Sequence, residues 1–388
     1  MTRALLVLIG GRQVPNLLSA QYLRPDRIVP VASHEALRPG DVWAHIEPVL
    51  RQLCPEGLQA PIVVDAFDLE AIRQGCSAAF DAWPEAEWVA NVTCATTVMS
   101  IGAYEAARAR GHAVWYLNSA RRQVVSLHGA PVASEQVYRL DIANYLSIYG
   151  RSLGKKLIQE PTLEACAAVL AQHPQATVAF REQLRAAGAD KKSPAASLVL
   201  PALSAEIQLI AEALHTAGLF SLTWPQAGGP PRAETVSKRL WGFINGGWLE
   251  VYAGMAAREA DCDDVCSGLE IPGVTGANNE LDLVATYGGT LIIGECKTDH
   301  KPFKTSYLDK LGSVGALLGG DFVTRIFICS QIVDLSDQSA SAAFKAFKRQ
   351  AAERRIVVVT GDALTRLAQQ LRTEAGNQPG AVPSYFLR

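Results

Sequence analysis

Apolar runs of strand length alternate with amphipathic stretches of helix length along the first 130 residues of the chain. The apolar runs are rich in β-branched residues and predict strands at Ala4–Ile9, Ile28–Ala32, Pro61–Ala66, Trp88–Thr93, Ala113–Leu117 and Gln123–Leu127. Apolar positions at helical spacing predict helices at Trp43–Leu53, Leu69–Phe80 and Met99–Gly111. This alternation is typical of a parallel, doubly wound α/β sheet.

Two loops lie where ligands bind such a sheet, at the carboxyl ends of its strands. One loop covers residues 10–16 after the first strand, and the other covers residues 93–97 after the fourth. The candidate ligand-binding residues in these loops are Gly11, Arg12, Gln13, Asn16, Thr93, Cys94, Ala95, Thr96 and Thr97. Simple turn chemistry is the alternative interpretation of both loops.

The rest of the chain changes pattern twice, and we expect three units: residues 1–140, 141–240 and 241–388. The middle unit looks like a helical or winged-helix connector, with helices expected at Ala202–Ala217 and Glu234–Asn245. In the last unit a helix at Gly247–Glu259 is followed by a loop rich in Asp, Gly, Asn and Pro.

After that loop, the two apolar runs Glu280–Thr286 and Leu291–Cys296 flank Tyr287-Gly288-Gly289, which is a hairpin signal. Further elements are expected at Tyr307–Leu318, Arg325–Cys329, Ser339–Arg355 and Arg355–Thr360. The last unit is therefore predicted to be a second, mixed α/β domain.

Composition narrows the function classes. The 388 residues carry a formal net charge of −2, from 36 Lys and Arg against 38 Asp and Glu, which excludes a binder that holds nucleic acid through bulk positive charge. No apolar run reaches the roughly 18 residues of a membrane span, so we expect a soluble, cytoplasmic protein without membrane contact. The 8 cysteines are scattered, and neither a disulfide framework nor a zinc site is expected.

Charged residues inside the predicted hairpin are the strongest chemical signal. Asp282 stands in one apolar strand, and Glu295-Cys296-Lys297 ends the next. Strand alternation points Glu295 and Lys297 to the same side, and the hairpin brings Asp282 beside Glu295. Charges in such strands are costly unless they serve a site. The plainer alternative is an exposed ion pair between Glu295 and Lys297.

Two adjacent carboxylates repel each other, and a divalent cation resolves that repulsion. Oxygen ligands suit Mg²⁺ or Mn²⁺, and Lys297 can then stabilise developing negative charge or help activate the attacking water. Glu250, on the preceding helix, is a candidate third carboxylate. The set Glu250, Asp282, Glu295 and Lys297 predicts metal-assisted hydrolysis of phosphodiesters.

The order Glu250…Asp282…Glu295-Cys296-Lys297 resembles the PD-(D/E)xK nuclease superfamily, which has a restriction-endonuclease-like fold. The resemblance implies Asp282 and Glu295 as metal ligands, the Cys296 backbone carbonyl as a further ligand, Lys297 as the catalytic lysine and Glu250 as the completing group. The Pro-Asp pair of the superfamily is replaced by Leu281-Asp282, which leaves Asp282 in place.

The N-terminal unit is similar to the Rossmann-like CARF sensor domain, so the whole chain resembles the CARF–PD-(D/E)xK effector nucleases of type III CRISPR defence. That resemblance implies a homodimer that binds a cyclic oligoadenylate, with cyclic tetra-adenylate as first choice, and then cuts DNA or RNA. The phosphate loop of the family reads Thr-Gly-Gly-Thr-Lys, whereas this chain has Thr93-Cys94-Ala95-Thr96-Thr97. The loop therefore lacks the lysine charge, which Arg12 could supply.

Basic side chains beyond the catalytic strand are candidate contacts for nucleic-acid phosphates. They are Lys301, Lys304 and Lys310. Two alternatives stay open: a constitutive nuclease whose N-terminal sheet only dimerises or binds another ligand, and a regulator that binds nucleic acid without cutting it.

Overall fold

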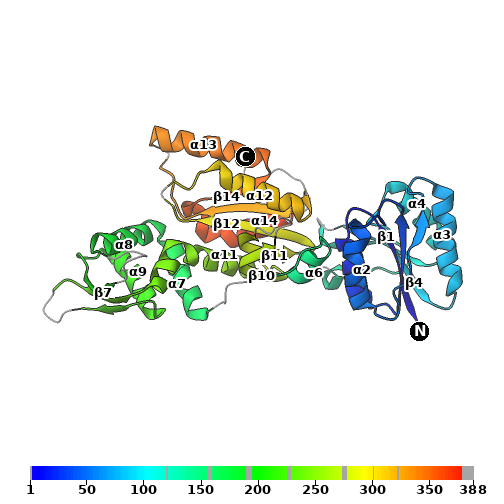
Figure 1. The fold of residues 1–388 in the computed structure, drawn as a ribbon, viewed down its shortest axis with the longest axis horizontal. Coiled ribbons are helices and arrows are strands. Elements are labelled where there is room, and N and C mark those ends of the chain that lie inside the picture. The colour runs from blue at the N-terminus through cyan, green and yellow to red at the C-terminus, as the bar shows by residue number, and fades with distance from the viewer. Residues whose placement is uncertain are drawn as a thin grey trace.

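The computed structural model describes residues 2–118, 121–137, 139–154, 160–188, 195–224, 229–272, 278–299, 301–320, 323–334 and 336–377. The molecule is elongated, with the N-terminal domain at one end, the C-terminal domain in the middle and the segment of α7–α9 at the other end (Figure 1). Most of the residues expected to connect the two domains therefore lie beyond the C-terminal domain, whereas residues 142–147 belong to the N-terminal domain, which contacts the C-terminal domain directly.

The N-terminal domain is a six-stranded sheet of order β3-β2-β1-β4-β5-β6. All neighbouring pairs are parallel except β5 with β6, so the predicted doubly wound sheet is confirmed. Its strands are β1 (Arg3–Ile9), β2 (Arg27–Ser33), β3 (Ile62–Val64), β4 (Glu87–Asn91), β5 (Ala113–Asn118) and β6 (Gln123–His128). Its helices are α1 (Val14–Leu23), α2 (Val42–Leu53), α3 (Leu69–Ala82), α4 (Thr97–Ala109), α5 (Ser134–Val137) and α6 (Ile142–Ser147).

Helix α1 begins at Val14, inside the segment expected to be a loop over residues 10–16, and the sequence analysis did not predict it. Pro15 stands in its first turn, where a missing N–H costs nothing, and the helix is apolar and buried through Ala20. Asn16, expected in a loop, is therefore part of a helix. Thr97 likewise begins α4, because the Thr96 side chain caps that helix by accepting a 3.2 Å hydrogen bond from the Met99 N–H.

The C-terminal domain is a mixed five-stranded sheet of order β10-β11-β12-β13-β14. Its strands are β10 (Asp264–Pro272), β11 (Asn278–Tyr287), β12 (Thr290–Lys297), β13 (Val323–Cys329) and β14 (Ile356–Val359). Its helices are α11 (Trp248–Glu259), α12 (Thr305–Leu317), α13 (Gln338–Glu353), a 3₁₀ turn (Gly361–Arg366) and α14 (Leu367–Ala375). The prediction of a loop after α11 is wrong in part, because β10 forms there by antiparallel pairing with β11.

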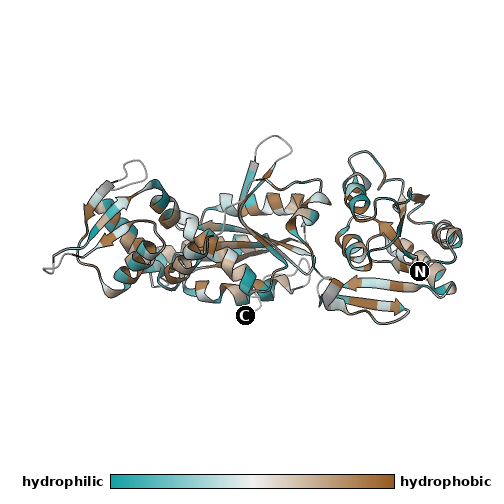
Figure 2. Cartoon of the chain, turned by 90° about the horizontal axis from the view of Figure 1, so that it is seen from below, coloured by the Kyte–Doolittle hydropathy of each residue, from teal (hydrophilic) through white to brown (hydrophobic). Residues whose placement is uncertain are grey.

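The middle segment holds α7 (Pro161–Gln172), α8 (Pro174–Ala186) and α9 (Ala205–Thr216) beside a small sheet of β7 (Ala195–Val199), β9 (Arg232–Val236) and β8 (Ser221–Thr223). The prediction of a helix at Glu234–Asn245 is wrong at its start, because Glu234 belongs to β9 and pairs with β7 and β8. Helix α10 (Lys238–Gly242) and a π-helical turn (Phe243–Gly247) then lead into α11. Apolar residues concentrate on strands and on the inner faces of helices along the whole chain (Figure 2).

Direct contact between the two domains runs through the β11–β12 turn. Gly288 and Gly289 have φ of 56° and 83°, as a tight hairpin turn requires. The Arg122 guanidinium lies 3.5 Å from the centre of the Tyr287 ring, and Arg122 also pairs with Asp263 at 3.3 Å. Within the described residues, none of the helices is both long enough and apolar enough to cross a bilayer.

The loops after β1 and β4 touch each other at Gly10, which gives a test of the fold. A Cβ at Gly10 would overlap the Cys94 carbonyl oxygen and lie 2.8 Å from the Ala95 Cα, whereas one at Gly11 would meet nothing within 4 Å. We expect Gly10→Ala to lower the free energy of unfolding of the N-terminal domain by about 1–3 kcal/mol, the usual cost of overpacking. Scanning calorimetry of the full chain, with Gly11→Ala as control, checks this; equal melting of both variants would contradict it.

Candidate active site

The hairpin of β11 and β12 places Asp282, Glu295 and Lys297 together. The antiparallel register pairs Leu283 with Gly294, so the next positions outward, Asp282 and Glu295, are neighbours across the two strands. Gly294 permits this close approach, because a Cβ there would lie 2.9 Å from the Leu283 Cβ. The apolar residues of both strands are buried and hold the charged end of the hairpin in place.

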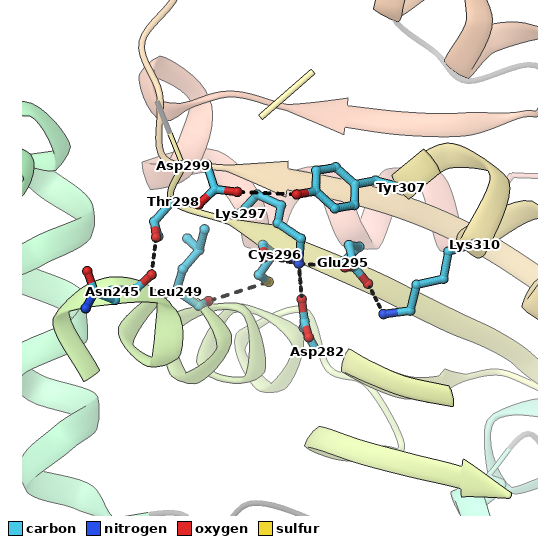
Figure 3. Close-up of polar contacts among 10 residues, drawn as sticks. All are labelled: Asn245, Leu249, Asp282, Glu295, Cys296, Lys297, Thr298, Asp299, Tyr307 and Lys310. Atoms are coloured by element: carbon cyan, nitrogen blue, oxygen red, sulfur yellow. Dashed lines mark hydrogen bonds and ion pairs between the residues drawn. The ribbon is translucent and has the colours of Figure 1, made fainter. Parts of the chain in front are cut away.

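The Lys297 ammonium lies between the two carboxylates (Figure 3). Its Nζ is 2.5 Å from Glu295 Oε1 and 3.4 Å from Asp282 Oδ2, and it donates to the Cys296 carbonyl oxygen at 3.0 Å. Asp282 Oδ2 also accepts a 2.6 Å hydrogen bond from the Cys296 N–H. The sequence thus anticipated the grouping of these residues, and the side chains are buried rather than an exposed ion pair.

Burial dominates the electrostatics of this cluster. The side chains of Glu295 and Asp282 are only 4% and 10% exposed. Loss of solvent raises the pKa of Asp282, and the nearby Glu295 charge raises it further. Burial acts to lower the pKa of Lys297, but the charges of Asp282 and Glu295 outweigh it and raise that pKa. Lys297 is therefore a protonated ammonium at neutral pH.

Glu250 approaches the same cluster from α11. Its burial, followed by the charges of Asp282 and Glu280, raises the pKa of Glu250 to about 7. Within the part of the chain that the structure describes, no three His, Cys, Asp or Glu side chains are arranged to hold a metal ion. Glu250 thus adds to the field at the site, while the close oxygen donors are the carboxylates of Asp282 and Glu295 and the Cys296 carbonyl.

The opposite side of β12 faces the helices. The Cys296 thiol lies 3.9 Å from the Leu249 carbonyl oxygen on α11, and the Thr298 hydroxyl donates to the Asn245 carbonyl oxygen (Figure 3). Arg181 on α8 donates to the Thr298 carbonyl oxygen at 3.3 Å. Burial raises the pKa of the Cys296 thiol well above its usual value, so this thiol is structural, whereas the Cys296 N–H bonds Asp282 and its carbonyl oxygen accepts from Lys297.

Two residues of α12 join the site, and sequence reasoning missed their roles. Lys310 Nζ lies 2.6 Å from Glu295 Oε2, so the lysine expected to contact nucleic acid pairs with this carboxylate (Figure 3). The Tyr307 ring centre is 5.0 Å from Lys297 Nζ, and its hydroxyl donates to Asp299 at 3.3 Å. Of the other predicted nucleic-acid contacts, Lys301 is exposed and Lys304 lies 5.7 Å from the Tyr307 ring.

The predicted ligand loops come together in the N-terminal domain, but some of their polar side chains are already hydrogen-bonded within the domain. Asn16 donates to the Leu8 carbonyl oxygen at 2.8 Å and to Gln13 at 3.0 Å, while Gln13 donates to the Gly10 carbonyl oxygen. Both side chains are buried, and Asn91, which the sequence analysis did not single out, donates to Asn16 at 2.9 Å. Gln13 and Asn16 therefore stabilise the loops through hydrogen bonds inside the domain.

In the second loop, some side chains are hydrogen-bonded or buried within the domain and others are exposed. The Thr93 hydroxyl donates to Asn91 at 2.6 Å, and the Thr96 hydroxyl donates to the Ala66 carbonyl oxygen at 2.8 Å. Cys94 is buried, whereas Thr97 is exposed, as are Gly11 and Arg12 in the first loop. A cavity of about 380 Å³ opens beside this loop and is lined by Val92, Thr93, Ala95, Thr97, Ser100, Ile101, Tyr104, Tyr116 and Leu127.

Residues 237–375 match the family model of the Card1-like endonuclease domain. This segment contains the whole carboxylate and lysine cluster. No curated protein sequence matches the chain significantly.

Solved structures share the fold over most of the chain. Protein VC1899 from Vibrio cholerae matches with a TM-score of 0.71 at 17% identity, over 97% of this chain and 99% of that one. Can2 from Sulfobacillus thermosulfidooxidans, solved with cyclic tetra-adenylate, matches with a TM-score of 0.66 at 20% identity, over 96% and 97%. A type III CRISPR defence DNA nuclease activated by cyclic oligoadenylate matches with a TM-score of 0.51 at 16% identity, over 85% of this chain and 45% of that one.

These matches confirm, for the fold, the likeness to CARF-domain nucleases that the sequence indicated. The chain combines a Rossmann-like domain with a Card1-like endonuclease domain.

Removing the central ammonium tests the electrostatics of the cluster. Lys297→Met leaves Asp282 without its ammonium partner and Glu295 with Lys310 alone, so we expect the free energy of unfolding in EDTA to fall by about 3 kcal/mol. Thermal melting in the presence of EDTA measures the effect. The exposed Lys301→Met variant, expected to stay within about 0.5 kcal/mol of wild type, is the control. Melting of Lys297→Met at the wild-type temperature would contradict the account.

Proposed function

We propose that this protein is a metal-dependent nuclease that hydrolyses phosphodiester bonds in DNA or RNA and is activated by a cyclic oligoadenylate. The observation that carries the proposal is the buried cluster of Asp282, Glu295 and Lys297 within a Card1-like endonuclease domain. A domain that only bound nucleic acid would gain nothing from two buried carboxylates held against each other, because their repulsion and desolvation are costly.

The donor set fits a Mn²⁺ or Mg²⁺ ion. Asp282, Glu295 and the Cys296 carbonyl oxygen supply hard oxygen ligands, and Lys297 now supplies the positive charge that these oxygens require. Glu250 adds its own charge to the field of the set from α11. When bound, such an ion polarises the scissile phosphate and lowers the pKa of the attacking water.

The side chains of the protein perform the remaining tasks. Lys297, once its carboxylate partners hold a cation, presents its ammonium to the charge that develops on the phosphate oxygens. Asp282 fixes the Cys296 peptide through the 2.6 Å hydrogen bond from its N–H, which orients the neighbouring carbonyl oxygen. Exposed Lys301 lies beyond the end of β12, where it can contact the nucleic-acid backbone.

The N-terminal domain is proposed to bind the activating ligand between two copies of the chain, with cyclic tetra-adenylate as first choice. The exposed positions of the two loops, Arg12 and Thr97, offer a cation and a helix N-terminus to phosphates. Beside Thr97, the apolar side chains of Ile101, Tyr116 and Leu127 are 44–45% exposed and line the cavity next to the loop. An apolar surface that continues from a ligand loop favours a second copy of the same domain as its cover.

Cleavage assays test the nuclease assignment. With Mn²⁺, cyclic tetra-adenylate and single-stranded or plasmid substrates, we expect Glu295→Gln and Asp282→Asn to lower the cleavage rate by at least about 100-fold, because both remove ligand charge. Glu353→Gln, an exposed carboxylate on α13, serves as the matched control. Equal cutting by wild type and Glu295→Gln under every condition would show that the active site lies elsewhere.

Calorimetry tests the ligand site. We expect Arg12→Ala to weaken cyclic tetra-adenylate binding about 10- to 100-fold, the loss of one charge-assisted contact to a phosphate. Arg51→Ala, which removes an arginine paired with Glu47 in α2, leaves the affinity unchanged. Ile101→Glu is expected to yield monomers in sedimentation and to abolish binding. If wild type binds no cyclic oligoadenylate of any ring size, a constitutive nuclease replaces the activated one.

A further inference from the structure

Glu295 is held by two ammonium groups, one on each carboxylate oxygen. Lys297 lies 2.5 Å from Oε1, and Lys310 lies 2.6 Å from Oε2. The two lysines come from different elements: Lys297 ends β12, and Lys310 lies in the second turn of α12 (Figure 3). Since Lys297 faces the other carboxylate as well, Lys310 alone sets the orientation of Glu295 from outside the hairpin.

Helix α12 holds Lys310 in a fixed position. Leu308 and Leu311, on either side of Lys310, are fully buried. Asp309, between Leu308 and Lys310, pairs with Arg354 at the end of α13 at 3.0 Å. Lys310 therefore has a rigid base, and a shift of the helix would move its ammonium relative to Glu295.

The far end of α12 is tied to the N-terminal domain. The Tyr145 hydroxyl on α6 donates to the Leu318 carbonyl oxygen at 2.9 Å, at the residue that caps α12. A Cβ at Gly319 would lie 2.8 Å from the Tyr145 hydroxyl oxygen and 3.0 Å from that of Tyr149, so the backbone fits closely against both tyrosines. The rings of Tyr145 and Tyr149 are 5.2 Å apart.

Of the two tyrosines, Tyr149 is the one within range of charged and polar groups in the ligand loops. It lies within electrostatic reach of Cys94 and Arg12, and burial raises its pKa, so it stays neutral. The chain of contacts therefore runs from Tyr149 and Tyr145 to the end of α12, and along α12 to Lys310. These links are packed or hydrogen-bonded contacts within one protomer, and such contacts can carry coupling between two sites.

We propose that Lys310 is a positioning residue for Glu295, and that the pair Tyr145–Tyr149 connects the N-terminal domain, which carries the ligand loops, to Lys310 through α12. This inference rests on the proposed nuclease function and extends it to how the Glu295 carboxylate is oriented in the active site. In the orientation found here, Lys310 holds Oε2 and leaves Oε1 directed toward Lys297 and Asp282, where a cation is needed. Positions that orient a metal-binding carboxylate typically change affinity or rate 10- to 100-fold when they are lost.

Kinetics distinguish positioning from direct contact with nucleic acid. We expect Lys310→Met to lower kcat about 10- to 100-fold while KM and the salt dependence of binding stay near wild type, and Lys310→Arg to restore most of kcat. Lys301→Met is the contrast: loss of a phosphate contact raises KM and reduces the salt slope by about 1. A Lys310→Met variant that behaves like Lys301→Met, or that retains wild-type kcat, overturns the assignment.

Failure of this inference is separable from failure of the proposed function. If neither wild type nor Glu295→Gln cuts, the nuclease assignment fails. If wild type cuts and Glu295→Gln does not, the assignment holds, and Lys310→Met then decides the positioning role alone. Melting temperatures of all variants show whether a loss of rate reflects unfolding.

The tyrosine contact is tested with Tyr145→Phe, which keeps the ring and removes the hydroxyl that holds Leu318. We expect stimulation of cleavage by cyclic tetra-adenylate to fall at least about 5-fold, the lower end of ordinary coupling between sites. Hydrogen exchange supplies a readout independent of activity: ligand binding should alter amide protection across residues 305–318 in wild type and not in the variant. Unchanged stimulation and unchanged exchange in Tyr145→Phe, or a wild type that no ligand stimulates, would refute the connection.

Discussion

The repulsion between two buried carboxylates is the constraint on which the active site depends. The β11–β12 register places Asp282 and Glu295 opposite each other, and Gly294 lets the two strands approach closely. Neither carboxylate has enough solvent to disperse its charge, so a cation must lie between them, and here that cation is the Lys297 ammonium. Because the two carboxylates need a positive charge in this place, the proposed function has a metal ion take the place of the ammonium.

The same hairpin that carries the carboxylates also joins the two domains. At its open end lie Asp282 and Glu295, and at its turn Tyr287 stacks on Arg122 of the N-terminal domain. A Cβ at Gly289 would lie 3.0 Å from Val14 in α1, the helix that follows the first ligand loop. This turn and the pair of Tyr145 on α6 and Tyr149 just after it both bring the N-terminal domain into contact with the elements that hold the site.

Local signals in the sequence were enough to find the hairpin and its charges. Two adjacent glycines between apolar runs predicted the turn, and Asp282, Glu295 and Lys297 stood out because charges are expensive in such strands. Contacts between residues that lie far apart in the sequence left no such signal. Lys310 has the sequence context of a surface lysine, and only the packing of α12 on β12 brings it to Glu295.

Other elements were missed for the same physical reason. Strand β10 contains Gly268 and ends at Pro272, so its sequence is typical of a loop, and pairing with β11 decides its structure. Asn16 and Asn91 are 75 residues apart, and their hydrogen bond depends on the adjacency of β1 and β4 in the sheet. Gln13 and Asn16 therefore looked available to a ligand, although the fold uses both side chains to brace the loop.

The exchange of the Lys297 ammonium for a metal ion is the central claim, and anomalous diffraction from crystals grown with Mn²⁺ and cyclic tetra-adenylate tests it most directly. The account predicts a manganese peak bounded by the carboxylates of Asp282 and Glu295 and the Cys296 carbonyl oxygen, with Lys297 Nζ moved away from Asp282. A map with no manganese at these oxygens and with Lys297 still between the two carboxylates would contradict it.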